Sequence, residues 1–217
     1  MTARPRFAVL WSRSLCAGAA LGLALTTSLC ANELPSAAKL MDDLMWNRGP
    51  IGGPFALVDH TGRPRTDADF RGKLMVIYFG YTSCPDICPA DLTSIAVAID
   101  QLGAEANEVQ PIFVTVDPER DTSEHLAEYV TAFHPRLIGL TGTSDEIRKV
   151  ATAYKTYFVK AEGRTVSDYV VDHTAFIYLV GRDGRYLGFL PPSTTPERIS
   201  EVIGQRLTSS SAPHTTR

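Results

Sequence analysis

Cysteine is scarce in this sequence of 217 residues, which holds four, and only Cys84 and Cys88 lie beyond the first 31 residues. Two thiols in the body of the chain can form a disulfide, exchange one with a partner protein, or bind a soft metal ion. Internal repeats are absent as well, and nothing in the composition indicates a second domain. At this length the chain is expected to fold around one hydrophobic core.

An excess of positive charge is also absent from the body of the chain. The first 31 residues contain three arginines and no acidic residue, so residues 32–217 keep 18 basic and 24 acidic side chains, a formal charge of −6. A surface of that sign repels the phosphate backbone of nucleic acids. We therefore expect no nucleic-acid partner.

Residues 1–31 have the pattern of an export signal. Three arginines precede 18 uncharged residues, from Ser14 to Ala31. The pattern predicts either a signal peptide cleaved after Ala31 or an uncleaved membrane anchor, because such a stretch is near the lower limit for spanning a bilayer. Leu29 stands where a lipoprotein signal would need a small residue, so lipidation is not expected. In both cases the body faces an extracytoplasmic space, expected to be the bacterial periplasm, which ordinarily oxidises paired thiols.

Strands and helices alternate through the body of the chain. Apolar runs predict strands at residues 55–58, 73–81, 111–116, 137–140, 175–180 and 185–189. Helical spacing of apolar side chains predicts helices at residues 92–102, 126–133 and 147–154, and a last one from Thr195. This order predicts an α/β fold with a central mixed sheet, helices on both faces and an extra N-terminal strand or hairpin. Cysteines that follow the first core strand and enter a helix are typical of a thioredoxin-like fold.

Three segments flank or interrupt this expected domain, which spans residues 55–207. Residues 32–54 are punctuated by glycine and proline and are expected to form an approach segment. Residues 161–168 are polar, which predicts a loop. Residues 208–217 are rich in serine and threonine, which predicts a disordered tail.

A proline follows each of the two cysteines. Because the residue before a proline avoids the helical conformation, we expect the helix to begin at Pro89, with Cys88 as its cap and Cys84 on the preceding loop. Backbone N–H groups at a helix start favour an anionic sulfur, which predicts a lowered pKa for the thiol pair. Three residues separate the cysteines, whereas a usual redox pair has two. The looser spacing suits a metal ion, which would need a third ligand.

The third ligand is sought among five histidines. Four of them are interpreted as solvated surface residues: His60, His125, His134 and His214. His173 differs because it leads into the apolar run of residues 175–180, at a position that packs beside the thiol loop in thioredoxin-like folds. The residues alone leave open whether His173 is a ligand or a structural residue. Asp172 could likewise orient the imidazole or belong to a turn.

Three motifs together resemble the Sco/SenC family of copper-binding thioredoxin-fold proteins. They lie at residues 78–89, 115–122 and 171–174, and the resemblance extends roughly from Phe55 to Ile203. It implies one copper ion, as Cu(I) or Cu(II), bound through Cys84, Cys88 and His173. Family members are exported or membrane-anchored and serve cytochrome c oxidase assembly. The implied partners are a copper-receiving subunit of the oxidase and a protein that donates copper or reduces thiols, with the chain itself a monomer.

Four hypotheses follow for the thiol pair. The leading one is a copper chaperone, because two thiolates and one imidazole form a soft set that suits Cu(I). The alternative is a metal-independent thiol–disulfide reductase that uses Cys84 and Cys88. A peroxide-reducing enzyme would need Thr or Ser where Tyr81 stands, and a plain structural disulfide is the fourth hypothesis.

Asp117 and Asp121 form a second acidic pair, inside the motif at residues 115–122. Their simplest interpretation is a turn and a helix cap, with Asp121 capping the next helix together with Glu124. Docking of a partner protein is the alternative.

Overall fold

The computed structural model describes residues 36–45, 49–165 and 168–209. The predicted leader at residues 1–31 lies outside these ranges, as does the predicted tail beyond Ser209. No helix within the described ranges is long and apolar enough to cross a lipid bilayer.

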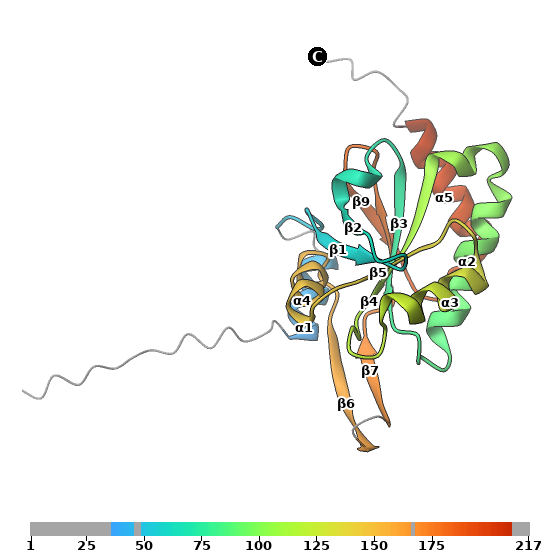
Figure 1. The fold of residues 1–217 in the computed structure, drawn as a ribbon. Helices are drawn as coiled ribbons and strands as arrows, with labels where there is room; N and C mark the ends of the chain where they lie inside the picture. The colour runs from blue at the N-terminus through green and yellow to red at the C-terminus, as the bar shows by residue number, and fades with distance from the viewer. Residues whose placement is uncertain (1–35, 46–48, 166–167, 210–217) are drawn as a thin grey trace, which may run out of the picture. The chain divides into compact units, whose positions relative to one another are not determined.

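A mixed sheet of seven strands forms the centre of the fold, in the order β2-β1-β5-β4-β3-β8-β9 (Figure 1). The three central strands are parallel and consist of β3 (Leu74–Gly80), β4 (Val109–Thr115) and β5 (Ile138–Thr141). On one side the antiparallel strands β8 (Ile177–Val180) and β9 (Tyr186–Leu190) extend the sheet, and on the other the hairpin of β1 (Ala56–Asp59) and β2 (Pro64–Thr66). The predicted α/β class, mixed sheet and N-terminal hairpin are confirmed.

Helices cover both faces of the sheet (Figure 1). One face carries α2 (Ile87–Gln101), α3 (Ser123–Phe133) and α5 (Pro196–Ser209), and the other carries α1 (Ala37–Met45) and α4 (Ser144–Ala153). Short 3-10 helices follow β2 and α2, at Asp67–Phe70 and Gly103–Glu108. A capping box formed by Thr143 and Glu146 starts α4.

Strand β3 is buried along its whole length and packs on both faces of the sheet. The ring of Tyr78 stacks on Phe113 with 6.5 Å between the centroids, while Phe79 points to the opposite face and meets Tyr154 at 5.6 Å. Neighbouring residues of a strand alternate between faces, so these two aromatic rings hold β3 from both sides. The strand end that leads into the cysteine loop is therefore rigidly placed.

Two parts of the chain differ from the prediction. Helix α1 lies within residues 32–54, and Leu40 and Leu44 on it are both 4% exposed, so this helix packs on the rest of the protein. The loop predicted at residues 161–168 is wrong, because β6 (Phe158–Thr165) and β7 (Asp168–His173) form an antiparallel two-stranded ribbon there. Two strands can pair through backbone hydrogen bonds without burying an apolar face. The polar composition of residues 161–168 therefore did not indicate these strands.

Candidate metal centre

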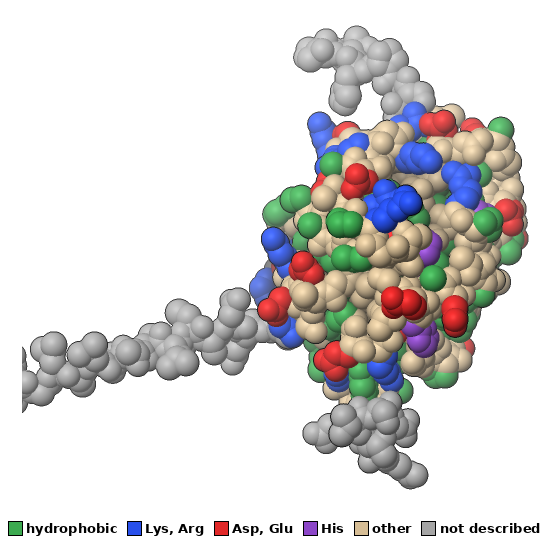
Figure 2. All heavy atoms as spheres, in the orientation of Figure 1, with side chains coloured by type: hydrophobic (Ala, Val, Ile, Leu, Met, Phe, Trp, Pro, Cys, Tyr) green, Lys and Arg blue, Asp and Glu red, His purple; other side chains and the backbone are tan. Residues whose placement is uncertain are grey.

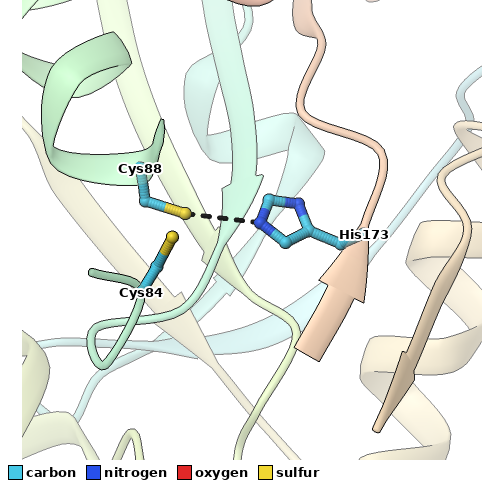
Figure 3. Close-up of side chains that lie close together, drawn as sticks. All are labelled: Cys84, Cys88 and His173. Carbon is cyan, nitrogen blue, oxygen red and sulfur yellow. Dashed lines mark hydrogen bonds between the residues drawn. The ribbon is translucent and has the colours of Figure 1, made fainter. Parts of the chain in front are cut away.

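Cys84, Cys88 and His173, the three residues named by the family resemblance, lie close together in the structure. Their ligand atoms all lie within 4.8 Å of one another, and Cys88 Sγ is 3.3 Å from His173 Nε2 (Figure 3). Each comes from a different element: Cys84 from the loop after β3, Cys88 from the first turn of α2, and His173 from the end of β7. The site is thus assembled from distant segments, since Cys88 and His173 are 85 residues apart in the sequence.

Helix α2 starts earlier than predicted. It begins at Ile87 with Asp86 in the N-cap position, so Cys88 lies inside the first turn and Pro89 is the third helical residue. The first N–H groups of a helix have no intrahelical acceptor, so proline costs nothing at that position. Cys88 is therefore the second residue of the helix and not its cap.

Gly80 lets the sulfur of Cys88 pack against the end of β3. A Cβ atom on this residue would lie 2.9 Å from Cys88 Sγ and 2.9 Å from the ring of Phe113. Both distances are closer than atoms approach in a packed core, so any side chain here would displace the sulfur. Gly80 belongs to the motif at residues 78–89, but nothing local in the sequence showed this role.

The two thiols differ in acidity, which corrects the prediction that both pKa values are lowered. Burial opposes ionisation of Cys84, but hydrogen bonds to its sulfur from His173 and from the backbone of Asp86 and Cys88 prevail and lower its pKa to about 6. Burial raises the pKa of Cys88 well above its ordinary value, and the nearby Cys84 adds to that shift. Cys84 is half-buried and Cys88 fully buried. Only Cys84 is therefore a thiolate at neutral pH.

This asymmetry predicts selective alkylation of the folded, reduced protein. A thiol with a pKa of about 6 is roughly 90% ionised at pH 7, and the thiolate is the reactive form. Iodoacetamide should modify Cys84 and spare Cys88, at a rate that rises through about pH 6 and then levels off. Peptide mass spectrometry after short exposures over a pH series measures this. Modification of Cys88 first, or a rate that still climbs above pH 8, would contradict the assignment.

The imidazole of His173 is oriented by its surroundings. Its Nδ1 lies 3.3 Å from the carbonyl oxygen of Thr174, and its Nε2 faces the two sulfurs. The ring of Tyr81 meets the imidazole edge-on, 5.8 Å between centroids and at 85°. Asp172 is exposed and points to the opposite face of β7, so it does not orient the ring.

The other histidines lie away from this site. His125 is exposed on α3, as predicted, and His214 lies outside the described residues. His134 is buried, contrary to prediction: its Nδ1 accepts a hydrogen bond from the backbone N–H of Arg136, and its Nε2 lies 3.4 Å from Asp100. His60 is half-buried and its Nδ1 accepts from the backbone N–H of Gly139. A histidine that binds neighbouring backbone groups can be buried without serving a metal.

Asp117 and Asp121 are both fully buried. The prediction that Asp121 caps the next helix is wrong, because the hydroxyl of Thr122 caps α3 and accepts the N–H of His125. Asp121 instead accepts hydrogen bonds from the backbone and the hydroxyl of Thr82, in the loop that carries Cys84. Asp121 is therefore part of the surroundings of the thiol loop.

The chain is similar to solved structures of Sco proteins, including one with copper bound. It is 43% identical to ScoI of Bradyrhizobium japonicum with copper bound, over 72% of this chain and 99% of that one, with a TM-score of 0.67. It is 27% identical to BsSco, described as a Sco family cytochrome c oxidase assembly protein with a disulfide switch, over 74% of this chain and 96% of that one, with a TM-score of 0.59.

A curated relative matches over a longer stretch. The mitochondrial protein SCO1 homolog of Homo sapiens is 40% identical over 199 residues, which cover 90% of this chain and 66% of the relative. The chain thus spans slightly under two thirds of that protein's length. A family model described as SCO1/SenC matches residues 43–208, which include Cys84, Cys88 and His173. On these grounds the chain belongs to the SCO1/SenC family.

Proposed function

We propose that this protein is a copper chaperone that binds one copper ion through Cys84, Cys88 and His173 and supports assembly of the copper centre of cytochrome c oxidase. The observation that carries the proposal is the convergence of two sulfurs and one imidazole nitrogen within 4.8 Å. Thiolate and imidazole are the ligands that soft Cu(I) prefers. The copper-bound ScoI structure and the description of BsSco support the same function.

The donor set favours copper over a structural zinc ion. Structural zinc sites are four-coordinate, with all ligands from the protein. Among the described residues, the only cluster of three or more His, Cys, Asp and Glu side chains that could hold a metal ion is this one, and it offers three donors. Three donors suit Cu(I) and leave space for an incoming ligand of a partner protein. Since Cys84 is half-buried, the exchange of ligands would begin on its side of the site.

Copper binding is coupled to protons and electrons in this proposal. Cys88 is protonated at neutral pH because burial raises its pKa, so the incoming metal displaces that proton. Both thiols must also be reduced, because a disulfide has no thiolate to donate. A thiol-reducing partner and a copper-donating partner would therefore both act before delivery to the oxidase subunit.

Anaerobic titration of the fully reduced protein with Cu(I) tests the proposal. We expect saturation at one copper per monomer, because one three-donor cluster is present in the described residues. Zinc serves as the comparison metal and should bind more weakly in competition. The proposal would be refuted by the absence of saturable copper binding. It would also be refuted if the double variant Cys84→Ser and Cys88→Ser bound copper with the same stoichiometry.

The setting of this function is proposed from the sequence. The basic and then uncharged residues 1–31 support export or anchoring, so we place residues 55–207, the copper-binding domain, in an extracytoplasmic space, the bacterial periplasm. Curated relatives are mitochondrial proteins. We propose that the chain acts as a monomer that meets its oxidase subunit through the half-buried face of the site.

A second function is favoured by a specific observation. A half-buried thiolate at Cys84, with a pKa of about 6, lies beside the fully buried Cys88. An accessible thiolate can attack a partner disulfide, and a buried thiol beside it can then resolve the mixed disulfide. The protein would thereby reduce the cysteines that receive copper, without a metal of its own. Its reduction potential must be low enough to reduce the partner.

A further inference from the structure

His173 is carried by a part of the fold that is not hydrogen-bonded to the main sheet. Strands β6 and β7 form a separate two-stranded ribbon, which projects from the body of the protein (Figure 1). The two cysteines, in contrast, follow directly on the buried strand β3. The distance between the imidazole and the sulfurs therefore depends on what holds the ribbon against the body.

Tyr169 makes several of the polar contacts that join the ribbon to the body, beside the ion pair of Lys160 with Glu119 at 2.7 Å. It lies four residues before His173 on β7, so both side chains are on the same face, together with the buried Val171. The hydroxyl of Tyr169 donates to Asp117 Oδ1 at 2.6 Å, and its carbonyl oxygen accepts from Arg120 Nη1 at 3.1 Å. The guanidinium of Arg120 also stacks on the Tyr169 ring, 3.8 Å from its centroid.

The segment from Asp117 to Asp121 also contacts the thiol loop. Asp121 accepts from the hydroxyl of Thr82 at 2.6 Å and from its backbone N–H at 3.1 Å, two residues before Cys84. Arg120 forms an ion pair with the carboxylate of Asp117 and lies 5.7 Å from the ring centroid of Tyr81, whose ring in turn meets His173. One short segment thus contacts both the loop that carries Cys84 and the ribbon that carries His173.

We propose that Asp117, Arg120 and Tyr169 are positioning residues for the metal site, which hold the ribbon so that His173 reaches the two cysteines. This inference rests on the proposed copper site. It gives Asp117 a structural role in that site. Asp121 fixes the thiol loop and Asp117 fixes the ribbon. Because Asp117 is fully buried and paired with Arg120, it cannot move to follow a displaced Tyr169 without breaking that ion pair.

Tyr169→Phe tests the proposal, since it removes only the hydroxyl and keeps the ring against Arg120. Copper affinity of the reduced protein, measured by competition with a chelator, should fall about 10- to 100-fold, the usual cost of losing a contact that orients a ligand. Tyr186→Phe on the edge strand β9 is the matched control and should stay within about twofold of the parent. An affinity of Tyr169→Phe equal to that of Tyr186→Phe overturns the proposal.

The same substitution in a His173→Ala background separates positioning from general support of the fold. If Tyr169 acts through His173, its loss should change the remaining affinity by less than about threefold. An equal loss in both backgrounds would show a merely structural role. If the His173→Ala protein holds no copper, electron paramagnetic resonance of the Cu(II) forms of the parent and of Tyr169→Phe provides the test. Nitrogen coupling from His173 should be weaker in Tyr169→Phe. Unchanged coupling overturns the proposal. A parent protein that binds no copper refutes the proposed function itself.

Discussion

Replacing His173 by alanine is expected to lower the copper affinity of the reduced protein by more than about 100-fold. Losing a residue that only orients a ligand costs about 10- to 100-fold, and losing a ligand should cost more. Nε2 of His173 is the single nitrogen donor of the cluster and lies 3.3 Å from Cys88 Sγ. Two thiolates alone would leave the metal two-coordinate. Competition with a Cu(I) chelator under anaerobic conditions measures the change.

His125→Ala is the matched control, because His125 is exposed on α3 and outside the metal-ligand cluster. It should leave affinity and stoichiometry unchanged. An unaltered affinity in His173→Ala would remove His173 from the ligand set. The same variant distinguishes the two proposed functions, since a metal-independent reductase should retain most of its reduction of a partner disulfide without this imidazole, whereas loss of either cysteine should abolish it.

Oxidation of Cys84 and Cys88 to a disulfide should abolish copper binding completely, and reduction should restore it. Both cysteines are free thiols in this structure, and their sulfurs lie within 4.8 Å of each other. Pairing them removes both thiolate donors and leaves one imidazole, which cannot retain Cu(I) against a chelator. The measurement is copper bound after gel filtration of protein that has been oxidised, and then of the same sample after reduction.

Cys84→Ser provides the control for this redox dependence. It cannot form the internal disulfide, so its weaker copper binding should not respond to a mild oxidant over the same range. Stoichiometric copper binding by the oxidised parent protein would mean that the sulfurs are not the donors. It would also favour a plain structural disulfide, the hypothesis that the compartment by itself suggests.

The sheet and its covering helices were predictable because their signals are local. The apolar run at residues 73–81 became β3, and apolar spacing at residues 126–133 became α3. The ribbon of β6 and β7 was missed because it is held by backbone pairing and exposes Val159 and Val170. Apolar periodicity reveals a strand when one of its faces is buried. A ribbon whose apolar side chains are partly exposed shows this periodicity only weakly.

The environments of single residues were less predictable. Pro89 biases Cys88 away from the helix, yet both lie in α2 because the first helical turn tolerates proline. Asp121 and Glu124 have the spacing of a capping box, but Asp121 bonds to Thr82, 39 residues away. A side chain that could cap a helix can instead bind a group that is distant in the sequence. For Asp121 that group is Thr82.

The sequence by itself determined which groups are candidates for the proposed copper site: two cysteines with three residues between them, directly after a core strand, and a histidine at the start of a later apolar run. Residue types, their spacing and their place beside apolar runs can all be read directly from the sequence. The tertiary structure decided that His173 reaches Cys88 across 85 residues and that Cys84 ionises readily while burial suppresses ionisation of Cys88. Distance between remote side chains and exclusion of water from a thiol arise only when separate elements pack, so neither is encoded in any local pattern.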